Sequence, residues 1–202
     1  METSIRLASI KDVDTIVKIH QAAFENFFLT SLGERFLRLY YSTFIKSSKG
    51  VVYCAEKDNN IVGFSACSYM SRGFNSNLIK ENLIKYGIES FLLLFSRPKA
   101  IIRLVKNLNK ENKNSDVDDK GEYAELYSIA ISPICQGEGV GKKLLTKTET
   151  DVKEHNNLIS LTTDYYNNEK TIGFYRSLGY QDYYEFVTYP NRKMWRLVKK
   201  LK

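Results

Sequence analysis

Hydrophobic and polar residues follow two different periods along this chain, and the changes between the periods outline the predicted elements. A strand shows alternation with a period of two, whereas a helix repeats its apolar residues at three- and four-residue spacing. Over the first part of the chain the pattern predicts a strand, two helices and a β-hairpin: Ser4–Ile10, Lys11–Phe24, the residues after Leu32-Gly33, and the pair Gly50–Glu56 and Ile61–Met70. The hairpin is expected because a polar turn, Lys57–Asn60, separates two β-rich runs.

The residues from about 71 to 120 are less regular. Leu78–Phe95 has a helical pattern, and the apolar residues between 101 and 108 predict a further amphipathic helix. Asn107–Lys120 is polar and mixed in charge, so we expect a loop there. We treat 71–120 as a helical insertion.

The second half of the chain returns to alternating strands and helices. The pattern predicts, in order, Tyr123–Ile131 (strand), Val140–Asn156 (helix), Ile159–Thr163 (strand), Asn168–Leu178 (helix), and a hairpin of Tyr183–Tyr189 with Met194–Val198. Asn168 occupies the expected N-cap of its helix, and Gly179 its C-terminal stop. The order predicts a mixed α/β fold, a β-sheet flanked by helices. We expect one domain over residues 1–202, with the insertion between strands 3 and 4.

Composition narrows the class of protein. The chain has 202 residues and a net charge of +7, which favours anionic partners, but dense lysine appears only at Lys199, Lys200 and Lys202. Cys54, Cys67 and Cys135 are scattered and odd in number, which argues against a disulfide framework or a zinc site. The N-terminus lacks the apolar core of a signal peptide, and no apolar run approaches the roughly 20 residues that span a bilayer. We therefore expect a soluble, cytoplasmic protein without a membrane span or a metal.

A glycine-rich turn stands between the strand that ends at Ile131 and the helix that follows. Such a turn exposes backbone N–H groups at a helix N-terminus, where phosphate binds. A Walker A loop would need glycine at Gln136 and Ser or Thr at Lys143, and a dinucleotide fingerprint would need glycine at Lys142. What remains is Gln-x-x-Gly-x-Gly, carried by Gln136-Gly137-Glu138-Gly139-Val140-Gly141. Alone, it also fits a helix start that binds nothing.

The turn resembles the pyrophosphate loop of the GCN5-related N-acetyltransferases, which reads Arg or Gln, two residues, Gly, one residue, then Gly or Ala. The preceding Ile129-Ala130-Ile131-Ser132-Pro133 is similar to strand 4 of that family. The later Asn168–Tyr175 looks like its Asn-containing helix that leads to Phe-Tyr, and Leu178-Gly179-Tyr180 matches the continuation. The resemblance covers Tyr123–Gln181 and, more weakly, Ser4–Met70. It implies an enzyme that transfers an acetyl group from acetyl-CoA to an amine.

The resemblance also implies residue roles. Tyr175 is the expected general acid for the CoA thiolate, although it could instead pack inside its helix face. Glu125 is the expected base, directly or through water, because a carboxylate on so apolar a strand is costly to bury without a partner or a role. With a period of two, Glu125 should share the face of Ile131. A Glu at an exposed strand edge, or one that fixes the acceptor, is the alternative.

The expected CoA contacts come from two segments and the later helix. Ile129, Ala130 and Ile131 should face the pantetheine arm, with the Ile131 N–H as oxyanion donor. The loop Gln136, Gly137, Glu138, Gly139, Val140 and Gly141 should hold the pyrophosphate. Asn168 is expected near the pantetheine or pyrophosphate, or as a helix cap alone. Lys142 or Lys143 could meet the 3′-phosphate or face solvent.

The acceptor is less defined by the sequence. The family places it between the first helices and the last hairpin, which here means Phe24–Leu32 and Tyr183–Arg192. These aromatic segments suit a small primary amine such as an amino-sugar, free or nucleotide-linked; a peptide or protein amine is the alternative. A CoA-binding module without catalysis is a rival, as is a membrane-surface or nucleic-acid binder using 78–108. We expect no nucleic-acid partner, and that helix pair should cover the acceptor cleft or form a homodimer contact.

Two histidines and a cysteine are not assigned catalytic roles. His20 lies on an apolar helical stripe and is expected to be a core or cleft residue. His155 lies near a helix end, where a cation is favourable. Cys135 has no adjacent base that would make it a nucleophile.

Overall fold

The structure is a computed structural model, and it describes residues 3–25, 27–99, 102, 117–188 and 190–202. A seven-stranded sheet with the order β1-β2-β3-β4-β5-β7-β6 runs through it. The strands are β1 (Ser4–Leu7), β2 (Gly50–Lys57), β3 (Asn60–Ser68), β4 (Ala124–Ile131), β5 (Leu158–Asp164), β6 (Gln181–Thr188) and β7 (Arg192–Lys200). Only the central β4–β5 pair is parallel; the other neighbours are antiparallel.

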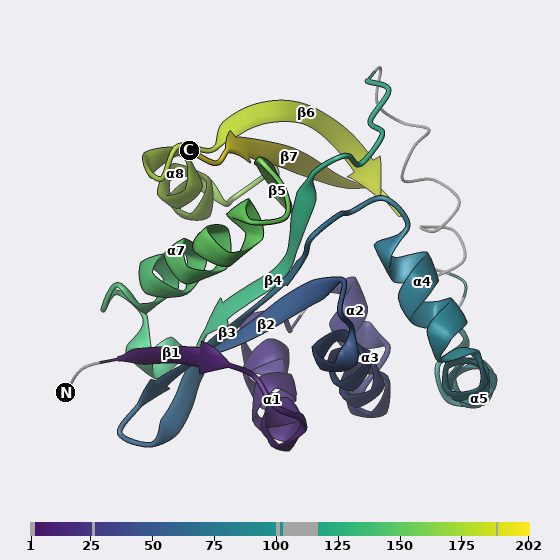
Figure 1. The fold of residues 1–202 in the computed structure, drawn as a ribbon. Coiled ribbons are helices and arrows are strands. Elements are labelled where there is room, and N and C mark those ends of the chain that lie inside the picture. Colours follow the sequence, from purple (N-terminus) through teal and green to yellow (C-terminus); the bar gives the residue numbers. More distant parts are fainter. Residues whose placement is uncertain (1–2, 26, 100–101, 103–116, 189) are drawn as a thin grey trace.

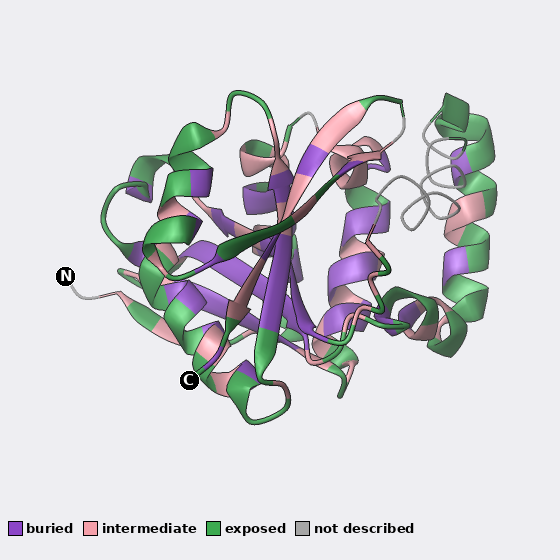
Figure 2. Ribbon diagram, turned by 90° about the horizontal axis from the view of Figure 1, so that it is seen from above, coloured by how far each residue is buried: buried purple, intermediate pink, exposed green. Residues whose placement is uncertain are grey.

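Helices cover both faces of the sheet (Figure 1). The helices are α1 (Val13–Ala23), α2 (Phe28–Ser31), α3 (Glu34–Lys46), α4 (Phe74–Glu81), α5 (Leu83–Ser96), α7 (Val140–Lys153) and α8 (Glu169–Ser177). One apolar core joins α1, α3, α4 and α5 to the sheet, with Tyr41, Phe44 and Phe64 fully buried. A second core lies between the sheet and α7 and α8, around Leu144, Leu145 and Ile159. Figure 2 shows the central strands buried between these layers, whereas β1 and β6 are largely exposed.

A β-bulge in β4 decides which residues face which layer. Cys67 pairs with Leu126 but the adjacent Ala66 pairs with Ser128, so Tyr127 is an extra residue in β4. The alternation of side chains therefore reverses at Tyr127. Ile131 packs in the α7 layer, whereas Glu125, on the other side of the bulge, faces the α1–α3 layer. The prediction that these two residues share a face is wrong.

The mixed α/β fold predicted from the sequence is confirmed, as is the hairpin of β2 and β3. Its turn uses Asp58 and Asn59 with φ values of 53° and 62°, a conformation that Asp and Asn tolerate better than most residues. The described part of the insertion between β3 and β4 is helical as expected, but Asn82 separates α4 from α5, which the pattern had merged. The short α2 was not predicted.

The helix predicted from the apolar residues between 101 and 108 lies almost entirely outside the described residues. Within the part of the chain that the structure describes, no helix is long and apolar enough to cross a membrane.

Candidate active site

The central strands diverge, and this opens the sheet. The β4–β5 ladder pairs only Ala124–Leu126 with Ile159–Leu161. Beyond Leu126, β4 continues to Ile131 paired with β3 on its other side. The edge of β4 that faces β5 therefore has backbone groups free of the ladder from Tyr127 onward, including those of Ile129, Ala130 and Ile131. An extended amide chain can pair with such an edge.

The glycine-rich turn lies at the end of this opened edge. A short 3₁₀ turn, Pro133–Cys135, leads into it, and α7 begins at Val140. Gly137 and Gly139 have φ values of 85° and 77°, which residues with a Cβ adopt at a cost. A Cβ would meet nothing within 4 Å at either position. Glycine is therefore needed here for the backbone conformation and not for space within the protein.

This turn leaves a row of N–H groups free. Lys143 is the first residue of α7 whose N–H finds a backbone acceptor, the carbonyl of Gly139 at 3.1 Å. Among the described residues, no acceptor is recorded for the N–H groups of Gly137–Lys142. Donors at the positive end of a 14-residue helix form a favourable site for an anion. The residues present therefore fit a pyrophosphate.

Two contacts fix the position of the turn. Glu138 accepts a hydrogen bond from Lys57 Nζ at 2.7 Å, which ties the turn to the β2–β3 hairpin. A Cβ on Gly141 would lie 3.7 Å from Ile131 Cγ1, so the first turn of α7 packs closely on β4. Lys142 and Lys143 are exposed, as either of their two predicted roles requires.

Tyr175 lies in α8, in the α7 layer, and only 7% of its surface is exposed. Burial raises the pKa of its phenol above the ordinary value of 10. No hydrogen-bond partner for its hydroxyl is found among the described residues, and its ring contacts Phe174 and Tyr180. A protonated phenol without an internal partner is free to donate to a ligand.

Asn168 occupies the N-cap position of α8, but its side chain forms no capping hydrogen bond. Instead Nδ2 donates to Thr163 Oγ1 at 2.6 Å and to the Asp164 carbonyl at 3.1 Å. Asn168 therefore fastens the start of α8 to the end of β5 and does not act as the cap that the sequence predicted. Its amide oxygen has no partner among the described residues.

Glu125 is buried, and each of its carboxylate oxygens has one hydrogen-bond partner. Arg196 Nη1 donates to its Oε1 at 3.0 Å, and Ser71 Oγ makes a short hydrogen bond to Oε2. Its backbone N–H reaches Ser68 Oγ at 3.3 Å. The sequence analysis expected this buried carboxylate to have a partner or a role, and it has a cationic partner, Arg196 from β7.

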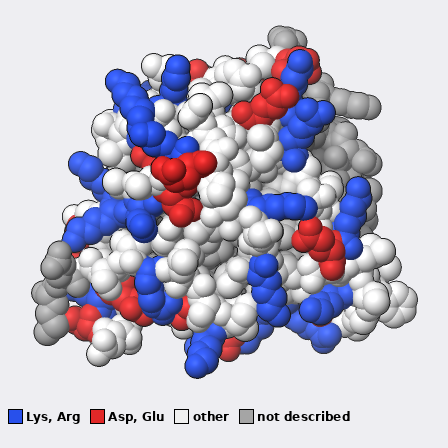
Figure 3. Space-filling model, in the orientation of Figure 1, with Lys and Arg blue, Asp and Glu red and all other residues white. Residues whose placement is uncertain are grey.

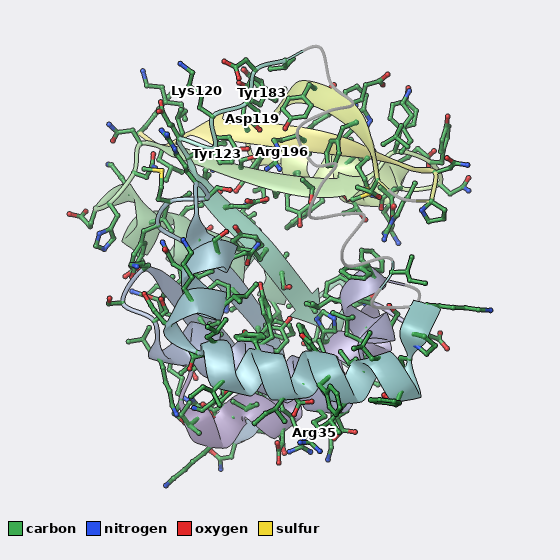
Figure 4. All side chains as sticks on the ribbon, turned by 90° about the vertical axis from the view of Figure 1, so that its right-hand side faces the viewer. Arg35, Asp119, Lys120, Tyr123, Tyr183 and Arg196 are labelled. Carbon is green, nitrogen blue, oxygen red and sulfur yellow. The ribbon has the colours of Figure 1, made fainter. Side chains whose placement is uncertain are left out.

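Arg196 links Glu125 to a second carboxylate, Asp119, whose Oδ2 lies 3.4 Å from Arg196 Nε. The hydroxyls of Tyr123 and Tyr184 donate to the same oxygen, each at 2.5 Å. Burial alone would raise the pKa of Asp119, but these bonds and the charge of Arg196 hold it below its usual value. Figure 4 shows Asp119, Tyr123 and Arg196 together beneath β6 and β7. We call Asp119, Tyr123, Glu125, Tyr184 and Arg196 the Arg196 cluster.

A second arginine, Arg192, connects the hairpin of β6 and β7 to the segment that leads into α2. Arg192 of β7 forms a two-point ion pair with Asp164, with N–O distances of 2.5 and 2.6 Å. Its guanidinium lies 4.0 Å from the centre of the Phe27 ring. The two segments expected to flank the acceptor, around Phe27 and around Arg192, are therefore in contact.

His20 belongs to α1, in the helical layer that Glu125 faces. Its Nδ1 is 2.7 Å from the Tyr41 hydroxyl, which donates in turn to Ser128 Oγ on β4. Its Nε2 is buried and has no partner among the described residues. Burial lowers the pKa of His20 to about 4, so its ring is neutral at pH 7. It is the core residue that the sequence predicted, with one nitrogen unsatisfied.

The sequence interpretation missed the arginines and aspartates of this region. The signal was available in β7, where Arg192 and Arg196 alternate with Lys193 and Trp195 and so occupy one face of a strand. Asp119 could not have been found, because it lies in a polar stretch without periodicity. Within the described part of the chain, no group of three or more His, Cys, Asp or Glu could hold a metal ion.

Comparison with known proteins agrees with this geometry. The acetyltransferase (GNAT) family matches residues 13–180. The fold is similar to the ribosomal-protein-S18-alanine N-acetyltransferase of Escherichia coli, with 14% identity, 100% and 95% of the two chains covered, and a TM-score of 0.62. An N-acetyltransferase from Staphylococcus aureus Mu50 has 12% identity, full coverage of both chains and a TM-score of 0.63.

A further similar structure was determined with coenzyme A bound. It is the PaiA N-acetyltransferase of Thermoplasma acidophilum, with 17% identity, 99% of each chain covered and a TM-score of 0.60. No curated protein matches the chain.

A strand whose edge is open at the centre of the sheet, followed by a turn with free N–H groups, fits the shape and charge of an acyl-CoA. The chain belongs to the acetyltransferase (GNAT) family, since the family match covers most of its length. It is accordingly an acyltransferase, and acetyl-CoA is the co-substrate of the class.

Proposed function

We propose that this protein transfers the acetyl group of acetyl-CoA to the primary amine of a small molecule, by direct attack of the amine while both substrates are bound. The observation that carries the proposal is the unpaired edge of β4 leading into the free N–H groups of Gly137–Lys142. The pantetheine arm of acetyl-CoA, paired with that edge, would lead to the pyrophosphate at the N-terminus of α7. We take residues 1–202 as one N-acetyltransferase domain.

In this proposal the backbone binds and orients the thioester. Ile129 and Ala130 offer amide groups to the pantetheine arm, and the Ile131 N–H stabilises negative charge on the thioester oxygen. The turn from Gln136 to Gly141 binds the pyrophosphate. Asn168 contributes its free amide oxygen near the opening.

Tyr175 would protonate the departing thiolate. Its phenol remains protonated at neutral pH because burial raises its pKa, and it has no competing internal partner. The acceptor ammonium, with an ordinary pKa near 10.4, must lose a proton before it attacks. For this step we retain Glu125 as the candidate base, acting through water, because both of its oxygens are engaged by Arg196 and Ser71.

The acceptor would bind on the face of the sheet that carries Arg192 and Arg196. There the two guanidinium groups pair with three carboxylates, those of Asp119, Glu125 and Asp164. Both arginines are already paired. This balance supports a neutral or cationic acceptor, such as an amino-sugar, more than a nucleotide-linked sugar.

The overall charge of the chain does not change that conclusion. Figure 3 shows Lys and Arg scattered over the visible face and interspersed with Asp and Glu, without one continuous basic surface. On this face, therefore, the net charge of +7 does not form a continuous surface for an anionic acceptor.

A screen of acetyl-CoA consumption tests the proposal. The panel would contain amino-sugars, their nucleotide-linked forms, amino acids, polyamines and peptides with free N-termini. We expect saturable CoA release with a small amine and initial-rate plots that intersect, as a ternary complex requires. Parallel plots would indicate an acetyl-enzyme. Peptides as the preferred acceptors would replace the small-molecule proposal, and tight CoA binding without any acceptor would leave a binding module.

A further inference from the structure

Helix α5 has an apolar face on each of two opposite sides. Tyr86 and Leu93 are buried, and Tyr86 contacts Phe36 and hydrogen bonds Thr43 of α3. The outward side has the large apolar residues of the helix in place of the polar face that a surface helix normally presents. These exposed residues are Leu83, Ile84, Ile88, Phe91, Leu92, Leu94 and Phe95.

Four of these exposed residues follow the spacing of a helix–helix seam. Ile84, Ile88, Phe91 and Phe95 are separated by four, three and four residues and are 80%, 52%, 60% and 76% exposed. This is the alternation of a and d positions in a heptad. At 100° per residue, all four lie on the side of α5 opposite Tyr86. In Figure 2, α5 is the long helix at the right edge, exposed along much of its length.

The area of this surface is that of a protein interface. A fully exposed large side chain presents on the order of 200 Å², so the seven exposed fractions amount to about 840 Å². The largest apolar patch of a typical monomer is about 300–600 Å². Each partner of a standard interface buries about 800 Å².

We propose that the outer face of α5 is the interface between two copies of this chain. The area of this face and the four- and three-residue spacing along it match a seam between two helices. A two-fold axis between Ile88 and Phe91 would pair two antiparallel α5 helices, with Ile88 against Phe91 of the second copy and Ile84 against Phe95. Each contact then occurs twice, as in an isologous dimer.

A groove beside the seam fits the same arrangement. It has a volume of about 620 Å³ and lies between the C-terminal half of α5 and the start of α3, lined by Leu32, Phe36, Leu92 and Phe95. In the antiparallel pairing, the N-terminal end of the partner helix passes over this half of α5. The groove wall is fixed by Arg35, which binds Glu89 at 2.5 Å; Figure 4 places Arg35 beside α5, far from Arg196.

The proposal is independent of acetyl transfer and is tested by sedimentation velocity on the full chain. Wild type is expected to be a dimer at micromolar concentrations. Ile88→Glu and Phe91→Lys should each weaken dimerisation at least 100-fold, because each buries an unpaired charge twice. Leu7→Glu, at an equally exposed apolar residue of β1, is the matched control and should leave the dimer unchanged. Thermal melting of each variant shows whether it is folded.

Mixing the two variants tests the register. In a heterodimer, Glu at position 88 of one chain faces Lys at position 91 of the other, and the second contact remains Ile88 with Phe91. An equimolar mixture should therefore dimerise although neither variant does. A monomeric wild type would overturn the proposal, with sedimentation on vesicles of anionic and zwitterionic phospholipid showing whether a membrane takes this face. Failure of the mixture to dimerise would overturn the antiparallel pairing.

Discussion

Replacing Arg196 with methionine should destabilise the fold far more than replacing an exposed arginine. Arg196 is the cation between Glu125 and Asp119, at 3.0 and 3.4 Å, and the three side chains are only 13%, 11% and 9% exposed. Methionine fills a similar volume but leaves both carboxylates buried without a cation. Removing one partner of a buried ion pair costs about 3–5 kcal/mol. For a chain of this size that is a fall in Tm of roughly 10 °C.

The matched control is Arg176→Met. Arg176 makes a comparable two-point pair with Asp182, but these side chains are 51% and 38% exposed. Such pairs contribute about 0–1 kcal/mol. Calorimetry at pH 7 would compare the two variants. Adding Glu125→Gln to Arg196→Met should recover part of the loss, because it removes one of the stranded charges. If the two arginine variants melt within about 2 °C of each other, the Arg196 cluster is not a buried ionic network.

Three further predictions concern single residues. Gly63→Ala should destabilise the fold by about 1–3 kcal/mol in denaturant unfolding, because its Cβ would lie 2.6 Å from Ile131 Cδ1; an unchanged midpoint would contradict this packing. Asp12→Asn should cost about 1–2 kcal/mol at pH 7, since the hydrogen bond from Arg6 lowers the pKa of Asp12 from 3.8 to about 2. That loss should shrink as the pH falls from 4 to 2 and vanish below pH 2, where the folded-state carboxylate is protonated; a pH-independent difference would exclude this linkage. Tyr175→Phe should lower kcat about 10²–10⁴-fold with CoA affinity nearly unchanged, and an unaltered kcat would remove Tyr175 as the acid.

The sequence predicted the fold well because its strands and helices have clear periods and clear stops. Gly137 and Gly139, which both have positive φ, lie in the turn that the glycine pattern identified from the sequence. The side of the sheet that Glu125 faces could not be predicted, because the bulge at Tyr127 arises from the pairing of β3 with β4 and leaves no mark in the sequence. The partner of Glu125 could not be predicted either, because Arg196 lies in β7, 71 residues further along the chain.

The central claim is that the turn before α7 binds the pyrophosphate of CoA. Calorimetric titration of wild type and Gly139→Val with CoA and with pantetheine, which lacks the pyrophosphate, tests it most directly. Valine cannot keep the φ of 77° at this position without strain, so the free N–H groups of the turn should lose their arrangement. We expect CoA affinity to fall at least tenfold while pantetheine affinity stays within twofold. Equal losses for both ligands, or none, would contradict the account.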